Sequence, residues 1–315
     1  MRSIVVAVLS SVAAIGSLQP AAAWWDEGHM QVAYLAYQRL DPAVKEKADA
    51  LLKLNPDYSK WVAGAPDAAT ARLYAFIHAA TWADDIKNKD YGYTADKVTS
   101  PTAGQNIGYA DHNQHAYWHY KDLVVSPDGL VAGPPDPVDA VTQLKRMIAA
   151  LPPASGASDD VRSYDLVWTL HLVGDVHQPL HAVTRFTHEL PDGDQGGNLE
   201  MVIPATGQVL ALHAYWDGLL GSYASPYGAA YDAKARDGAG SITPNAGEAS
   251  IEDPDVWVNE SRVLAEKYAY APPVGTGPNP VMLTRTYETD ARNIALSQVA
   301  LAGARLGNLL NKALK

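Results

Sequence analysis

The 315-residue sequence has no cysteine, which excludes disulfide bonds, thiolate nucleophiles and cysteine-ligated zinc. Any metal site must therefore use histidine, aspartate, glutamate or backbone atoms. Basic residues are also in short supply, because 24 lysines and arginines stand against 35 aspartates and glutamates. The formal charge of −11 argues against a broad basic surface that holds duplex nucleic acid, but it leaves room for a small phosphate site carried by metal ions.

Apolar stretches long enough to span a bilayer are missing as well. The N-terminus has a shorter one, in which Arg2 precedes the apolar run 4–9 and Ala21-Ala22-Ala23 supplies a cleavage site. This pattern predicts a signal peptide over residues 1–23 and an exported, periplasmic or secreted protein, with a membrane-tethered form as the alternative. Cleavage would make Trp24 the new N-terminus and remove only Arg2, so that 23 basic against 35 acidic residues leave a charge of −12.

Apolar residues recur at helical spacing through most of the remaining chain. The pattern predicts helices over residues 28–40, 41–54, 67–82, 137–151, 158–176, 209–220, from 253 onward and over 280–314. Strand signals are scarce, and residues 198–204 give the best one. The Gly/Pro/Asp-rich stretches 88–114, 126–137, 184–198 and 236–250 are predicted to be loops rather than domain linkers. We therefore expect a single all-α domain over residues 24–315.

Histidine and aspartate recur at metal-ligand spacing in two places. His171 and Asp175 are four residues apart near the end of an apolar helix, so both project from one face, and Pro179 turns the chain so that His181 can return over that face. His213 and Asp217 repeat the spacing. A single pair would be read as a structural ion pair, since such contacts arise readily on helices. Two pairs together with His181 favour a site for a divalent metal ion.

Three further positions offer ligands of the same kind. Asp84 closes the predicted helix 67–82 in a Trp-Ala-Asp sequence, and His119 stands between two aromatic residues. Trp24 and His29 lie five apart at the predicted mature N-terminus, where a free α-amino group and its adjacent carbonyl oxygen can chelate a metal. The alternatives are that Asp84 is an ordinary helix-capping aspartate, that His119 is a partly buried structural histidine and that the terminus at Trp24 is frayed.

In order along the chain, these elements are Trp24 with His29, Trp82-Ala83-Asp84, His119-Tyr120, the segment 171–181, Gly196-Gly197-Asn198, and His213 with Trp216-Asp217. The ordered set resembles the secreted zinc-dependent single-strand nucleases and 3′-nucleotidases of the S-one/P-one type, which are related to bacterial zinc phospholipase C. The resemblance extends over residues 24–217. It implies a mostly helical fold with three zinc ions in one cleft.

The resemblance also assigns roles to individual residues. By position, Asp84, His119, His171 and Asp175 would hold one zinc ion, His181, His213 and Asp217 a second, and Trp24, His29 and Asp175 a third. Asp175 would bridge two ions and, with Asp84 and Lys87, would form the catalytic set, with Lys87 near the scissile phosphate. Tyr120 would stack on a base, Asp122 would contact the edge of that base, and Asn198 would lie near the phosphate.

Phosphodiester hydrolysis needs a strong nucleophile, neutralised phosphoryl charge and a stabilised leaving group, all of which divalent metals supply. Five histidines and three carboxylates around three ions give −3 against +6, so the site would be cationic inside an acidic protein. Release of the 3′-oxygen would leave 5′-phosphorylated products. A recessed cleft admits a splayed nucleotide rather than a stacked duplex, which predicts single-stranded DNA and RNA as substrates of a monomer without stable duplex binding.

Some features depart from the family pattern or leave alternatives open. Fungal relatives carry disulfides, whereas this chain must hold its loops by packing and metal. Residues 182–195 are long and charged for this loop, so the second wall of the base pocket is undefined. His78, His112, His115 and His188 are read as solvated or structural. A zinc phospholipase C that acts on lipid headgroups is the nearest rival, although Asp217 stands where that branch is expected to have glutamate. A non-catalytic protein with saturated zinc sites is the other rival.

Overall fold

The computed structural model describes residues 24–221, 225–275 and 279–315, and the predicted signal peptide 1–23 lies outside them. The helices are α1 (Asp26–Arg39), α2 (Pro42–Leu52), α3 (Tyr58–Trp61), α4 (Ala68–Ala79), α5 (Trp82–Asp85), α6 (Ala140–Ala150), α7 (Asp159–Asp175), α8 (Leu212–Asp217), α9 (Pro226–Ala233), α10 (Ala246–Ala249), α11 (Pro254–Leu264) and α12 (Arg285–Ala313). The strands are β1 (Leu123–Val125), β2 (Val183–Arg185), β3 (Met201–Ile203), β4 (Leu210–Ala211) and β5 (Val281–Met282). The prediction of a mostly helical fold is confirmed.

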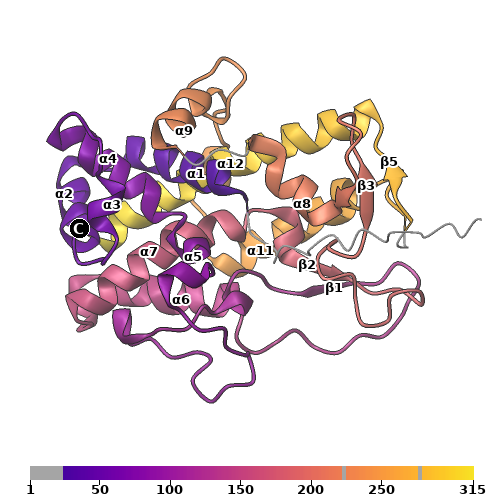
Figure 1. The fold of residues 1–315 in the computed structure, drawn as a ribbon, viewed down its shortest axis with the longest axis horizontal. Coiled ribbons are helices and arrows are strands. Elements are labelled where there is room, and N and C mark those ends of the chain that lie inside the picture. Colours follow the sequence, from indigo (N-terminus) through magenta and orange to yellow (C-terminus); the bar gives the residue numbers. More distant parts are fainter. Residues whose placement is uncertain (1–23, 222–224, 276–278) are drawn as a thin grey trace, which may run out of the picture.

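Helix α7 lies at the centre, between α1 and α12 on one side and α6 on the other (Figure 1). Its first turn is capped by Ser158, whose hydroxyl accepts from the backbone N–H of Val161 at 3.3 Å. From Ser163 to Asp175 every residue is buried, so apolar side chains occur on every face of the helix there, with a few buried polar residues among them. A helix enclosed in this way is a rigid carrier for the polar side chains at its C-terminal end.

Helices α1 and α12 pack unusually closely. A Cβ atom at Gly303 would lie 2.6 Å from Cβ of Leu35, and one at Gly307 would lie 2.9 Å from Cβ of Arg39. The two glycines are one helical turn apart, so they form a stripe against which α1 fits. This contact fixes α1, whose first turns carry His29, against the rest of the fold.

Two small sheets lie beside the helices. Strands β1 and β2 are parallel, with Leu123 opposite Val183, and they join segments that are 60 residues apart. Strand β3 is central in a second sheet, antiparallel to β4 and parallel to β5. The first sheet matters for the site because it brings the segment after His119 against the segment after His181.

The structure corrects several boundaries. Trp82 does not close the predicted helix 67–82, because α4 ends at Ala79 and Trp82 begins the separate helix α5. Thr81 stands at the break, and its hydroxyl donates to the carbonyl of His78, a local bond that competes with helix continuation. The predicted helix 209–220 begins only at Leu212, since residues 210–211 pair with β3. None of the described helices has both the length and the apolar character that a bilayer crossing requires.

Candidate metal centre

The last turn of α7 carries the first group of ligands. His171 and Asp175 project from the same face, and Nε2 of His171 lies 3.2 Å from Oδ2 of Asp175. His119, which follows the short 3₁₀ turn Ala116–Trp118, places its Nδ1 3.1 Å from the same carboxylate oxygen and 2.9 Å from Nε2 of His171. All three side chains are buried. The predicted pair on α7 is therefore joined by a third ligand from a distant segment.

Asp84 and His29 approach this group from α5 and α1. Oδ1 of Asp84 lies 3.6 Å from Nδ1 of His119 and 3.9 Å from Nε2 of His171. Nε2 of His29 lies 3.3 Å from Oδ1 of Asp175, and its ring is stacked on that of His171 at 3.9 Å between centroids. The two oxygens of Asp175 thus face different histidines, the arrangement expected of a carboxylate that bridges two ions.

His181, His213 and Asp217 form a separate group. The Nε2 atoms of the two histidines are 3.1 Å apart, and Oδ2 of Asp217 lies 3.5 Å from Nε2 of His213. Pro179 begins the 3₁₀ turn Pro179–Ala182, and the turn places His181 against His213 and Asp217 of α8, whereas the sequence predicted that it returns over the face of His171 and Asp175. Gln178 holds the carboxylate, since its Nε2 donates to Oδ1 of Asp217 at 2.7 Å.

Backbone carbonyls fix the tautomers of three of these histidines. Nδ1 of His171 donates to the carbonyl of Ala80, Nδ1 of His181 to that of His119, and Nδ1 of His213 to that of Gly196, at 2.7, 2.8 and 2.7 Å. A carbonyl oxygen only accepts, so each Nδ1 carries the hydrogen and each neutral Nε2 presents a lone pair. Two such lone pairs facing each other at 3.1 Å repel unless a cation lies between them. On a tetrahedral zinc ion, ligand nitrogens are about 3.3 Å apart, which is close to this separation.

The ionisation of three buried histidines also fits a cation, whereas the carboxylates of Asp175 and Asp84 outweigh burial and raise the pKa of His171, and burial raises the pKa of Asp217. Burial lowers the pKa of His29 to about 4 and the pKa values of His119 and His213 to about 3, so these imidazoles are neutral ligands. Both ring nitrogens of His29 and Oδ1 of Asp175 are buried without a hydrogen-bond partner. Among the described residues, the groups His29–Asp84–His171, His119–His171–Asp175 and His181–His213–Asp217 could each hold a metal ion. The donor set of imidazole nitrogen and carboxylate oxygen suits a borderline divalent metal.

Lys87 lies at the mouth of the first group. Its Nζ donates to Oδ1 of Asp84 at 2.6 Å, and both side chains are only slightly exposed. Burial alone would raise the pKa of Asp84, but Lys87 and the neighbouring histidines hold it well below its usual range. Asp84 is therefore an ionised ligand with a cation beside it. The role predicted for Lys87, near the scissile phosphate, stays a prediction.

Trp24 is fully buried beside these groups. Its side chain packs on Gly28, where a Cβ atom would lie 2.6 Å from Cβ of Trp24. The next backbone N–H, of Trp25, donates to the carbonyl of Asp217 at 3.1 Å. The backbone of Trp24 is therefore tied to the end of α8, where the ligand Asp217 stands.

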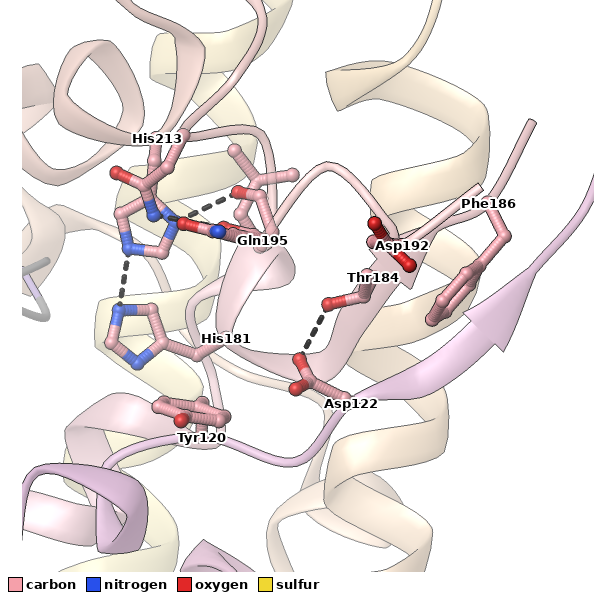
Figure 2. A pocket seen from close by; sticks show the side chains of 11 residues that line it. Tyr120, Asp122, His181, Thr184, Phe186, Asp192, Gln195 and His213 are labelled. Atoms are coloured by element: carbon pink, nitrogen blue, oxygen red, sulfur yellow. Dashed lines mark hydrogen bonds between the residues drawn. The ribbon is translucent and has the colours of Figure 1, made fainter. Parts of the chain in front are cut away.

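A cavity of about 310 Å³ opens next to the group of His181 and His213, and both histidines line it. Tyr120, Asp122 and Asn198, the three residues predicted to contact substrate, line it too. Figure 2 shows the ring of Tyr120 beside His181 and the carboxylate of Asp122 farther from the histidines. The wall that the sequence left undefined is made by Thr184, Phe186, Asp192 and Gln195.

A family model described as S1/P1 Nuclease matches residues 24–315, essentially the entire described chain. The chain belongs to the S1/P1 nuclease family. Membership implies a metal-dependent phosphodiester hydrolase that acts on nucleic acid, and it agrees with the resemblance drawn from the sequence motifs. No individual curated protein matches the chain significantly.

The partners of two polar residues in the S1/P1 motif that carries His181 were not assigned from the sequence. Gln178, inside the motif that carries His181, holds Asp217 as described above. His177 accepts from Nη1 of Arg305 on α12 at 2.9 Å and donates through Nδ1 to the carbonyl of Val173. For Gln178, the only indication in the sequence was its place inside the motif. For His177, no local pattern indicates its contact with Arg305, which is 128 residues away.

Proposed function

We propose that this chain is an exported, zinc-dependent nuclease that hydrolyses single-stranded DNA and RNA to 5′-phosphorylated products and removes the phosphate of 3′-nucleotides. The observation that carries the proposal is Asp175, whose two oxygens face separate histidines; a second histidine group, His181 and His213, lines a cavity with an aromatic ring. Residues 24–315 would act as one domain and as a monomer, after removal of residues 1–23.

Three zinc ions would be held as the motifs assign them. The ligands would be Asp84, His119, His171 and Asp175 for one ion, His181, His213 and Asp217 for the second, and Trp24, His29 and Asp175 for the third. When bound, the ions would supply a strong nucleophile from water near neutral pH, neutralise phosphoryl charge and stabilise the departing 3′-oxygen. The protein supplies the imidazoles and carboxylates and fixes their orientation.

Substrate contacts follow from the cavity. Tyr120 offers a ring on which one base can stack, and Asn198 stands with His213 at the cavity edge, near the position expected for the phosphate. Lys87, already directed at the ligand group, places a positive charge close to the same phosphate. Because the ligands are buried, a base must leave its stack to bring its phosphate to them, which selects single strands.

The proposal is tested with the mature chain beginning at Trp24. Single-stranded DNA, single-stranded RNA, a 3′-mononucleotide and phosphatidylcholine are each incubated with the zinc-loaded protein, with and without EDTA. Release of 5′-mononucleotides that EDTA abolishes and zinc restores is the expected result.

Each contrary outcome points elsewhere. Hydrolysis of the lipid alone would move the chain to the phospholipase C branch. Absence of turnover on all four substrates, with three bound zinc ions measured by elemental analysis, would mean a saturated structural site and would refute the proposal.

A further inference from the structure

The side of the cavity away from the metal ligands is made of hydrogen-bond acceptors. Figure 2 shows Asp122, Thr184 and Asp192 together there, opposite His181 and His213. The hydroxyl of Thr184 donates to Oδ1 of Asp122 at 2.6 Å, so its hydrogen is already used. Oδ2 of Asp122, the hydroxyl oxygen of Thr184 and the carboxylate of Asp192 are left as acceptors, and we name these three residues the acceptor wall.

Nearby cations are turned away from the acceptor wall. The two that adjoin cavity residues in the chain are paired elsewhere: Lys121 with Asp139 at 2.5 Å and Arg185 with Glu200 at 2.5 Å. Among the described residues that line the cavity there is no lysine or arginine. Burial raises the pKa of Asp122 to about 6, which leaves this carboxylate ionised at neutral pH. The wall therefore presents negative charge to the cavity.

The loop that carries Asp192 is built to hold it in place. The backbone N–H of Arg185 donates to Oδ1 of Asp194 at 2.8 Å, and the N–H of Asp194 donates to the carbonyl of Arg185 at 3.0 Å. Gly193 has a φ of +86°, and a Cβ atom there would lie 2.3 Å from Cγ2 of Thr184. Only glycine permits this approach, which closes the loop so that Asp192 stands beside Thr184.

We propose that the acceptor wall selects guanine as the base bound in this cavity. Guanine is the common base whose Watson–Crick edge presents two adjacent donors, N1–H and the N2 amino group, to a row of acceptors. Adenine and cytosine present one amino group beside an acceptor nitrogen, and uracil and thymine present one N–H between two carbonyl oxygens, which the carboxylates repel. The inference rests on the proposed nuclease function and adds its base preference.

The N2 amino group can be tested alone, because hypoxanthine is guanine without it. Initial rates are measured for 3′-GMP, 3′-IMP and 3′-UMP at pH 7.5 with the zinc-loaded protein. We expect kcat/KM to be at least about tenfold higher for 3′-GMP than for 3′-IMP, and lowest for 3′-UMP, since a hydrogen bond to a charged acceptor is worth roughly that factor. Asp192→Asn should reduce the ratio of kcat/KM for 3′-GMP to that for 3′-IMP toward one. The control is Asp90→Asn, which makes the same charge change at an exposed residue outside the cavity and should leave this ratio unchanged.

The outcomes separate the two proposals. Equal rates for 3′-GMP and 3′-IMP in the unmodified protein would overturn guanine selection and leave the nuclease standing. A preserved ratio in Asp192→Asn would remove Asp192 from the acceptor wall. If the protein cuts RNA but no mononucleotide, base preference is measured from the bases at the cleavage positions of an RNA of mixed sequence. Lack of guanine enrichment at these positions would overturn the inference. Failure to cut single-stranded DNA, RNA and every mononucleotide would instead refute the proposed function itself.

Discussion

Replacement of Gly174 by alanine should remove one zinc ion without unfolding the protein. Gly174 lies in the last turn of α7, and a Cβ atom there would lie 2.7 Å from Nδ1 of His29 and 3.0 Å from its Cε1. Ordinary contact begins at 3.4 Å, so the ring must retreat by 3.4 − 2.7, or 0.7 Å. The ring is also stacked on His171 and placed 3.3 Å from Asp175, and it cannot keep both contacts after such a move.

The size of the displacement decides the expected effect. Metal–ligand distances in proteins hold to within about 0.2 Å, so a shift of 0.7 Å takes His29 out of coordination range. Alanine also has a higher helix propensity than glycine by about 1 kcal/mol, which offsets part of the steric cost within α7. We therefore expect Gly174→Ala to remain folded and to bind the third zinc ion at least about tenfold more weakly.

The measurement is zinc content per chain after dialysis against a zinc buffer, with a thermal melt to establish folding. Gly104→Ala is the matched control, because a Cβ atom at Gly104 would meet nothing closer than 3.5 Å, and it should retain three ions. A folded Gly174→Ala protein that binds three zinc ions as tightly as the unmodified chain would refute the steric argument and the role of His29.

Three other predictions concern the bridge, the N-terminus and a buried acid. Asp175→Asn should lower both zinc content and nuclease activity, the latter by more than about 100-fold; full activity with three ions would exclude the bridging role. A chain with two residues added before Trp24 should bind one zinc ion fewer than the chain that begins at Trp24. Equal zinc content in the two chains would exclude metal chelation by the N-terminus. Burial raises the pKa of Asp165 from 3.8 to about 7, so the folded state retains a proton that the unfolded state has lost, and stability falls as pH rises through that window. Asp165→Asn keeps the hydrogen bond from Asn106. Its free energy of unfolding should exceed that of the unmodified protein by up to about 4 kcal/mol at pH 8, but should not exceed it at pH 4. Urea unfolding of both proteins at pH 8 and at pH 4 measures this difference.

Local patterns predicted the parts of the site that lie on single elements. The four-residue spacing of His171 and Asp175 needs only the helical period, and the turn at Pro179 needs only the chemistry of proline. The bond between Thr184 and Asp122 depends instead on the parallel pairing of β1 with β2, two three-residue strands without a strand pattern of their own. Such pairings are set by tertiary packing, which the sequence does not express locally. This is why the second wall of the cavity had to come from the structure.

The proposed metal ligands would also give a chain without cysteine a means of holding its loops. The proposed ligand side chains come from α1, α5, α7, α8 and the two 3₁₀ turns near His119 and His181, so bound ions would connect segments from His29 to Asp217. Removing the ions would leave facing lone pairs and partnerless carboxylate oxygens inside the fold. The free energy of zinc binding would therefore be coupled to folding, as disulfide closure is in cysteine-containing proteins. Bound divalent ions would make this site cationic inside an acidic protein, so that cross-linking of the fold and attraction of a phosphate would arise from one set of side chains.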